Sequence, residues 1–233
     1  MSAALELCDV AAIASIIVPV LNEAERIATV LADLAGLRAQ GVELIIVDGG
    51  SRDGTVAACA MAADQVLQAP RGRARQMNAG AAAATAPLLI FLHADTRLPD
   101  GALAAVQNAL SGAVWGRFDV AIAGRSAMLP VIALMMSWRS RLTGIATGDQ
   151  AMFMRRDAFE AVGGFPDQPL MEDIELSRRL RRLGPPACLR QRVVTSGRRW
   201  DSRGAWRTIV LMWRLRWRYW RGTSAEVLVR AYR

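Results

Sequence analysis

The sequence predicts one α/β domain, a doubly wound and mostly parallel sheet with flanking helices. Three continuous apolar runs, each of a length typical of a buried strand, are separated by segments that favour helices. These runs are residues 16–20, 42–47 and 88–92. Polar residues follow each run closely: Asn22 with Glu23, then Asp48, then His93 with Asp95. Because parallel strands end at one edge of a sheet, these side chains are expected to converge there on a ligand.

Helical segments connect the predicted strands of the first half. Asn22, with Glu25 three positions later, is expected to cap a helix that runs to residue 38. Pro99 is expected to start another helix, which reaches residue 110. The other elements expected here are a short helix ending near residue 63, a short strand at residues 66–67 and a helix at residues 73–84. Alternation of this kind favours parallel strands joined by crossover helices.

The second half has a more mixed pattern. Apolar residues alternate with others between Val114 and Ile122, which predicts an exposed or antiparallel strand. Asp157 can cap a short helix, and Gly184 with the two prolines after it ends a helix that begins at Glu172. The other elements expected here are a helix at residues 127–141, strands at 151–154 and 193–194, and a helix at 204–221.

Composition limits the class of protein. The chain has 233 residues, which suits one large domain with its own core, and a formal net charge of +8. This charge is compatible with nucleic acid, an anionic membrane or a phosphorylated small molecule as partner. Because Cys8, Cys59 and Cys188 are far apart and form no CxxC pair, we expect a reducing cytoplasm and neither a disulfide framework nor a zinc site. The first residues lack the basic flank of a signal peptide, and no apolar stretch reaches the length of about 20 residues that spans a membrane.

The turn after the second predicted strand carries an informative motif. Residues 48–55 read DGGSRDGT, with glycines for tight backbone geometry and with carboxylates and hydroxyls for capping. The motif lacks the Gly-Lys-Ser/Thr ending of a P-loop and the GxGxxG pattern of dinucleotide-binding sites. We expect Asp53 to cap the following helix. Asp48 is then free to face a ligand, or it shapes the turn.

Asp95 is a candidate ligand for a divalent cation bound to a diphosphate, or it starts a turn that Thr96 and Pro99 continue. Carboxylates gathered at one sheet edge need cations or hydrogen bonds from a ligand. A nucleotide with its metal ion supplies both.

Six short motifs, in order along the chain, resemble glycosyltransferase family 2. They are VPVLNE at residues 18–23, VDGGSRDGT at 47–55, HAD at 93–95, GDQ at 148–150, GGF at 163–165 and MED at 171–173. The resemblance extends over residues 15–200 and implies a GT-A fold, with a nucleotide-binding half (15–112) and an acceptor-side half (113–200). It also implies that a sugar is transferred, with inversion, from a nucleotide-diphosphate sugar to an acceptor hydroxyl. The chain is similar as well to a small bacterial subgroup linked to arsenosugar biosynthesis and to radical-SAM enzymes.

The resemblance implies a role for each matching position. The residues implied in donor binding are Pro19, Asn22, Glu23, Asp48, Arg71, Arg73, Arg75, Ala94, Asp95, Arg198 and Arg199. Among them, Asp48 would face the base or the ribose, and the arginines would approach the base or the diphosphate. Asp95 would bind Mg²⁺ or Mn²⁺ between the two phosphates. Asp173, beside Glu172, would be the general base that deprotonates the acceptor, while the pair also places favourable negative charge in the first turn of a helix.

Two positions depart from the family pattern. His93 stands at the first position of the DxD motif, where a neutral imidazole suits Mn²⁺ better than Mg²⁺. Three roles are open for His93: it binds the metal, it contacts a metal ligand without binding the metal itself, or it belongs to the hydrophobic core. Ser196 replaces the Gln of the QxxRW segment of processive synthases, which argues against a polymer synthase. Arg198 and Arg199 then screen the leaving diphosphate or form a solvated basic loop.

The predicted helix at residues 203–221 is basic and amphipathic. Its apolar face is Trp206, Ile209, Val210, Trp213, Trp217 and Trp220, and its basic face is Arg207, Arg214, Arg218 and Arg221. This pattern is typical of a helix on an anionic membrane surface, here the inner face of the cell membrane. It is also typical of a helix whose tryptophans pack on the domain while its arginines face water. The apolar segment around Pro130 is a second candidate for membrane contact, or for a homodimer surface.

Two other classes of function were considered. A nucleotidyltransferase would carry a glycine-rich basic segment directly after the first strand, where this chain has residues 19–23 (PVLNE). A nucleic-acid-binding protein needs no acidic clusters at strand ends, since these repel phosphate, and the chain has no recognised nucleic-acid motif. No nucleic-acid partner is therefore expected.

Overall fold

An eight-stranded sheet runs through the computed structural model, which describes residues 12–232. The strand order is β3-β2-β1-β4-β7-β6-β8-β5. The strands are β1 (Ala14–Val20), β2 (Val42–Asp48), β3 (Gln65–Gln68), β4 (Leu88–Phe91), β5 (Thr96–Arg97), β6 (Trp115–Ala123), β7 (Met152–Arg155) and β8 (Ala187–Ser196). Because one sheet contains strands of both halves, the predicted single α/β domain is confirmed.

Strands β3, β2, β1 and β4 are parallel, as the three apolar runs predict. In this register Val20 at the end of β1 lies beside Asp48 at the end of β2. Strand β1 is buried on both faces: Ile16 and Val18 contribute to one core cluster, and Ile17 contributes to the other. A strand covered on both faces has no polar side, which explains why these runs are continuously apolar.

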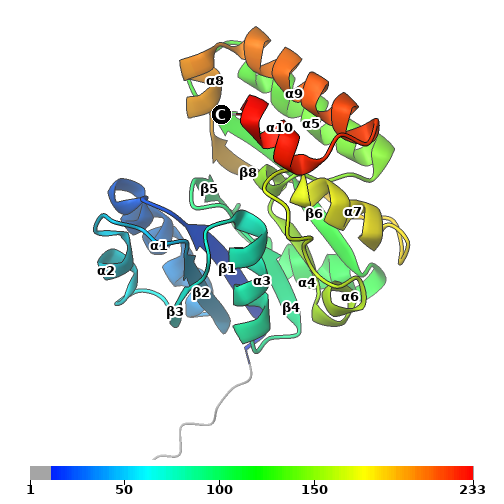
Figure 1. Cartoon of the computed structure of the whole chain (residues 1–233). Helices are drawn as coiled ribbons and strands as arrows, with labels where there is room; N and C mark the ends of the chain where they lie inside the picture. The colour runs from blue at the N-terminus through cyan, green and yellow to red at the C-terminus, as the bar shows by residue number, and fades with distance from the viewer. Residues whose placement is uncertain (1–11, 233) are drawn as a thin grey trace, which may run out of the picture.

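Helices cover both faces of the sheet and form a further layer at one end of the molecule (Figure 1). They are α1 (Ala24–Arg38), α2 (Thr55–Cys59), α3 (Arg73–Ala83), α4 (Ala102–Gly112), α5 (Leu129–Thr143), α6 (Arg156–Ala161), α7 (Glu172–Leu180), α8 (Arg198–Arg203), α9 (Ala205–Trp220) and α10 (Ala225–Tyr232), with a 3₁₀ turn η1 (Gly148–Gln150). Helices α1 and α4 share a core cluster on one face, and α3, α6 and α7 share the cluster on the other. Helices α9 and α10 pack around Leu215 and Leu228.

Strand β6 was predicted to be exposed or antiparallel, and its pairing with β7 is antiparallel. It also pairs parallel with β8, so it lies inside the sheet, and most of it is buried rather than exposed. Its alternation includes Arg117, which is itself buried and donates hydrogen bonds to the Ser140 hydroxyl and the Ser137 carbonyl. Arg117 also forms an ion pair with Asp119, so its charge is balanced inside the protein. Because charged and apolar residues alternate here, the sequence of this buried strand looks like that of an exposed one. Strand β5 and helices α8 and α10 were not predicted.

The capping of α1 also differs from the prediction. Asn22 is not the N-cap: its backbone has φ +53°, and the helix begins after Glu23. The Ala24 amide donates instead to Asp53 Oδ2 at 3.2 Å, while the Thr55 amide donates to Asp53 Oδ1 at 3.0 Å. Asp53 therefore serves the start of α1 as well as that of α2, and it links the two turns that follow β1 and β2.

Cys59 and Cys188 are free thiols, and Cys8 lies outside the described residues. The predicted absence of a signal peptide also concerns residues that lie mostly outside this range. Within residues 12–232, no helix combines the length and the hydropathy needed to cross a membrane.

The contact between α3 and the sheet depends on a glycine, and a matched pair of variants tests this. A Cβ atom at Gly80 would lie 2.5 Å from Ile17 Cγ2, whereas Gly36 on the exposed side of α1 has nothing within 4 Å. We expect Gly80→Ala to lower the free energy of unfolding by about 1–3 kcal/mol through overpacking. Gly36→Ala should raise it by up to about 1 kcal/mol, because alanine favours helix. Urea denaturation of both variants measures the difference, and equal stabilities would contradict the close packing of α3.

Candidate functional site

A pocket of about 290 Å³ lies at the carboxyl ends of β1 and β4, the edge at which the sequence predicts a ligand. Its lining residues come from the turn after β1, the start of α3 and the turn after β4. They are Pro19, Val20, Leu21, Glu23, Arg71, Gly72, Arg73, Gln76, His93, Ala94 and Asp95. Six of the predicted donor-binding residues are among them: Pro19, Glu23, Arg71, Arg73, Ala94 and Asp95.

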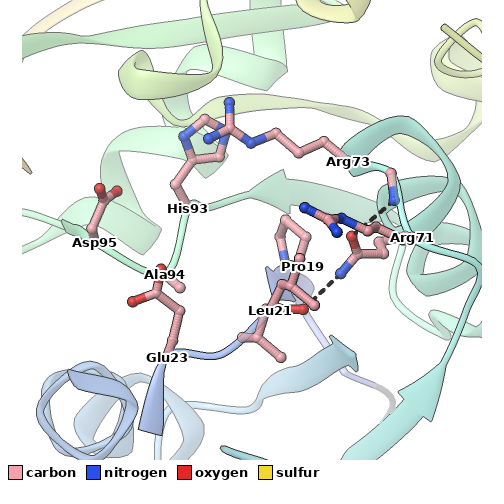
Figure 2. Close-up of a pocket in the computed structure, with 11 residues that line it drawn as sticks. Pro19, Leu21, Glu23, Arg71, Arg73, His93, Ala94 and Asp95 are labelled. Carbon is pink, nitrogen blue, oxygen red and sulfur yellow. Dashed lines mark hydrogen bonds between the residues drawn. The ribbon is translucent and has the colours of Figure 1, made fainter. Parts of the chain in front are cut away.

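The two walls of the pocket differ in charge. Figure 2 shows the carboxylates of Glu23 and Asp95 on one side and the guanidinium groups of Arg71 and Arg73 on the other, with Arg73 reaching toward His93. Guanidinium groups bind phosphate oxygens through paired hydrogen bonds, and carboxylates bind hydroxyls or hard cations. The pocket thus offers matching chemistry for a sugar hydroxyl, a diphosphate and a divalent cation.

Gln76 forms the base of the pocket and was not predicted. It is buried, and its Nε2 donates to the carbonyls of Val20 (2.9 Å), the last residue of β1, and Val47 (2.8 Å), the last but one of β2. The Val20 carbonyl also accepts the Gly49 amide at 3.0 Å. Gln76 therefore links the ends of the two strands and fixes α3 over the sheet edge. The sequence signal was its position three residues after Arg73, on the same helix face.

Asp48 does not face the pocket, so the expectation that its carboxylate is free is wrong. Asp48 is buried, and its carboxylate accepts the backbone amides of Gly50 at 2.9 Å and Ser51 at 3.0 Å. Gly50 has φ +93°, a conformation that turns these amides inward toward the carboxylate. Asn22 is also absent from the pocket lining, because its Oδ1 accepts the amide of Arg52 at 2.8 Å. Both residues shape the turns beside the site.

Asp95 has the chemistry of a cation ligand. Its carboxylate is partly exposed in the pocket and makes only long contacts, 3.4 Å from Thr96 Oγ1 and 3.8 Å from Arg198 Nη2. A carboxylate in this state can bind a hard cation without breaking a strong hydrogen bond. Within residues 12–232, no cluster of three or more His, Cys, Asp or Glu side chains forms a complete metal site. A cation at Asp95 would therefore take its other ligands from the bound diphosphate and from water.

His93 connects the pocket to the η1 turn rather than to Asp95. Its Nδ1 lies 3.4 Å from Asp149 Oδ1, and a Cβ atom at Gly148 would lie 2.4 Å from the imidazole Nε2. The Gly148 amide in turn donates to Asp173 Oδ2 at 2.9 Å. The turn after β4 and the start of α7 are therefore held together through the single turn η1.

The acidic pair at the start of α7 lies beside the same pocket. Glu172 is buried, and burial together with the neighbouring charge of Asp173 raises the pKa of Glu172 to about 7. Burial alone would lower the pKa of Arg73, but the charges of Glu172, Asp149 and Asp173 outweigh it and raise that pKa. Arg73 thus lies within electrostatic reach of both the donor pocket and the acidic pair.

Two further arginines lie within electrostatic reach of Asp173 and were not predicted. Arg139 comes from α5 and Arg216 from α9, and burial lowers the pKa of both, that of Arg139 to about 9. Nε and Nη2 of Arg139 are buried and have no hydrogen-bond partner among the described residues. The sequence did offer a signal, because Arg216 is the one arginine of α9 outside the basic face predicted for this helix.

The remaining predicted arginines divide between the site and other contacts. Arg198 reaches the site through its contact with Asp95, as noted above. Arg199 instead donates to the Tyr232 carbonyl at 2.9 Å and stacks on the Tyr232 ring, so it secures α10. Arg75 pairs with Asp167 at 2.7 Å and does not line the pocket. Arg198 thus lies close to the pocket, Arg199 and Arg75 are engaged in other contacts, and none of the three lines the pocket.

Comparison with known proteins agrees with this geometry. The family model described as "Glycosyl transferase family 2" matches residues 15–163. No curated protein matches the chain.

Solved structures of glycosyltransferases share the fold. Mannosyltransferase PcManGT from Pyrobaculum calidifontis, in complex with GDP-Man and Mn²⁺, has a TM-score of 0.62 and 23% identity, with 78% of this chain and 56% of that chain covered. S. aureus TarS 1-349 in complex with UDP has a TM-score of 0.65 and 16% identity, with 79% and 60% covered. The same protein with UDP-GlcNAc has a TM-score of 0.63 and 15% identity, with 79% and 58% covered. The chain therefore spans about six-tenths of the length of these proteins.

The raised pKa of Glu172 predicts a pH dependence of stability. The folded protein holds a proton on Glu172 up to about pH 7, while the unfolded chain loses it near pH 4.5. The stability that the folded protein gains by holding this proton is therefore complete below pH 4.5, and it is lost as the pH rises to 7. Between pH 4.5 and 8, the wild type should lose about 1–3 kcal/mol more unfolding free energy than Glu172→Gln. Denaturation across this range measures it, with Glu160→Gln, at an exposed position, as control. Parallel curves for wild type and Glu172→Gln would show that Glu172 is ionised throughout.

Proposed function

The chain belongs to glycosyl transferase family 2, and on this basis we propose that it transfers a sugar from a nucleotide-diphosphate sugar to an acceptor hydroxyl. We propose further that the reaction inverts the configuration at the anomeric carbon. The observation that carries the proposal is the position of Arg73, which lines the donor pocket and also lies within electrostatic reach of the acidic pair at the start of α7. Arg73 would then contact the donor diphosphate and lie near the general base.

The donor would lie across the two walls of the pocket. Arg71 and Arg73 would bind the diphosphate, and Arg198 would approach it from the side of Asp95. Pro19 and Glu23 would contact the nucleoside, Pro19 through apolar packing and Glu23 through a hydroxyl of the ribose. Since the similar structures hold GDP-Man in one case and UDP or UDP-GlcNAc in the other, both guanine and uracil donors are candidates.

Asp95 would hold a divalent cation, Mg²⁺ or Mn²⁺, on the diphosphate side of the pocket. When bound there, the cation would supply positive charge to the leaving diphosphate. His93 would not bind the cation but would position Asp95, because its contacts with Gly148 and Asp149 fix the turn that carries Asp95. The similar mannosyltransferase structure contains Mn²⁺, which supports a metal requirement without choosing between the two ions.

Asp173 would be the general base. The acceptor hydroxyl would give its proton to the Asp173 carboxylate while its oxygen forms a bond to the anomeric carbon. The bond from that carbon to the diphosphate oxygen breaks, and the nucleoside diphosphate leaves with the electron pair. The amides of Gly148 and Ile174 hold the carboxylate of Asp173 in place. Glu172, largely protonated up to about pH 7, would leave a single negative charge at this position.

We propose that the acceptor carries negative charge. The resemblance to the subgroup linked to arsenosugar biosynthesis stays a prediction about this substrate. Arg139 and Arg216, which lie within electrostatic reach of Asp173, favour an acceptor that carries negative charge. The buried nitrogens of Arg139 have no hydrogen-bond partner among the described residues and would be stabilised by an anion. Cytoplasmic location likewise stays a prediction.

Replacing the proposed base tests the reaction. Asp173→Asn keeps the size of the side chain but removes its ability to take a proton. Turnover of the donor, with water or an acceptor as nucleophile, should fall at least about 100-fold. Nucleotide binding, measured by isothermal titration calorimetry, should change less than about threefold, because Asp173 does not line the donor pocket. Asp100→Asn, at an exposed position before α4, is the matched control. Full turnover in Asp173→Asn would exclude this residue as the base.

A thermal-shift panel tests the donor site and its metal. Nucleoside diphosphates and nucleotide sugars are each added with Mn²⁺, Mg²⁺ or a chelator. One nucleotide family should raise the melting temperature more with metal than with chelator, because binding to the folded state alone stabilises it. Asp95→Asn should lose the metal-dependent part and keep the rest. A metal effect that survives in Asp95→Asn would place the cation elsewhere, and no shift with any nucleotide would contradict the donor site.

A further inference from the structure

Helices α5 and α9 carry most of the exposed large apolar side chains among the described residues. Those on α5 are Val131, Leu134, Met135, Trp138 and Leu142, and those on α9 are Trp206, Val210, Trp213, Trp217 and Trp220. At about 100° per residue, each set covers roughly a quarter to a third of its helix circumference. Each helix therefore presents an outer apolar stripe, and we refer to the two stripes together as the α5–α9 surface.

The tryptophans of α9 do not pack on the domain, so the alternative in which they form core is wrong. Five of the seven tryptophans in the chain lie on the α5–α9 surface, with exposed fractions between 59% and 78%. The buried side of α9 is formed instead by Thr208 and Leu215. Tryptophan is usually buried in folded proteins, and large exposed apolar patches mark surfaces that meet a partner.

The two helices lie together at one end of the molecule. Figure 1 shows α9 and α5 in the layer at the top of the view, with α10 beneath α9. On their inner sides, Arg139 of α5 and Arg216 of α9 are close enough for each charge to act on the other. Asp201 of α8 also accepts the backbone amides of Arg125 and Ser126, just before α5. These interactions place α5 and α9 next to each other at this end of the molecule, so their outer stripes lie on neighbouring helices.

The border of this surface is cationic. Neither α5 nor α9 contains an Asp or Glu, and from Arg198 to Ser224 the sequence has eight arginines and one acidic residue, Asp201. Arg207, Arg214, Arg218 and Arg221 form a row along one side of the tryptophan stripe. A hollow of about 370 Å³ at the edge of α5 adds Arg190 and Arg192 beside Trp138 and Leu134. The hollow also contains Asp119, whose carboxylate pairs with Arg117 and Arg141. Apolar surface, indole rings and guanidinium groups thus occur together with an excess of positive charge.

We propose that the α5–α9 surface docks on an anionic lipid bilayer, with its tryptophans at the level of the headgroups. Indole rings favour the boundary between acyl chains and headgroups, and arginines near the surface attract anionic lipids. The hollow beside Trp138 is large enough to take part of a headgroup, with Arg190 and Arg192 near its phosphate. A symmetric dimer through this surface would instead bring the like-charged rows of two copies together, which is unfavourable.

Vesicle sedimentation of the full chain tests the proposal. Vesicles contain phosphatidylcholine alone or phosphatidylcholine with phosphatidylglycerol, at low and at high salt. The wild type should bind the anionic vesicles, with a blue shift of tryptophan fluorescence, and salt should weaken this binding. The double variant Trp213→Ala/Trp217→Ala should lower the partition coefficient at least about tenfold. The matched control is Met61→Ala/Leu183→Ala, which removes exposed apolar side chains outside α5 and α9 and should bind as the wild type does.

Several outcomes would overturn the proposal. No binding to anionic vesicles would do so, as would equal binding to neutral and anionic vesicles. A dimer that dissociates in Trp213→Ala/Trp217→Ala, without vesicle binding by the wild type, would assign the surface to a second copy. Circular dichroism checks that this variant folds, and Trp206→Ser at the first turn of α9 provides a second, milder variant. Nucleotide binding is measured on the same proteins, so that failure of docking and failure of the transferase proposal are distinguishable.

Discussion

The contact of His93 with Gly148 joins the two halves of the sheet at the point where the proposed chemistry takes place. A side chain at residue 148 would occupy the place of the imidazole, so only glycine lets η1 approach the turn after β4. The amide of the same glycine holds Asp173, and the next residue, Asp149, contacts His93. The donor-side carboxylate Asp95 and the acceptor-side carboxylate Asp173 are therefore positioned through one short turn. The distance between these two carboxylates is therefore set by the fold before any ligand binds, which favours catalysis.

Charge in the cleft is only partly balanced without a substrate. Acidic groups act on Arg73, whereas Arg139 has buried nitrogens without hydrogen-bond partners among the described residues. On the acidic side, burial and the neighbouring charge of Asp173 keep Glu172 protonated to about pH 7. Such an arrangement costs stability in the empty protein and is relieved by an anionic ligand. The proposed donor would supply that anion to the pocket, and this is why we read the cleft as a binding site rather than as a structural ion-pair network.

The parts of the fold that the sequence predicted are those set by burial alone. Strands β1, β2 and β4 are continuously apolar because both faces are covered, and no other element of the chain has that pattern as clearly. Asp48 shows the limit: a carboxylate after a strand looks the same whether it faces a ligand or accepts the amides of its own turn, as it does here. Arg117 shows a second limit of prediction from sequence, since a buried arginine gives β6 the sequence pattern of an exposed strand. Both errors arise from hydrogen bonds, which composition and periodicity do not reveal.

Helix α9 presents the same difficulty in a form that bears on function. Its period identifies an apolar stripe, but Leu215 and the tryptophans are all apolar, so the period cannot say which side faces inward. The structure turns Thr208 and Leu215 inward, with Arg216 near Asp173, and leaves the tryptophans outside. A helix packed on the core would bury its largest apolar side chains first, because they gain most from leaving water. The observed orientation is explained if α9 faces two environments. Its inner side faces the charged groups near Asp173, and its outer side faces the apolar part of a lipid bilayer.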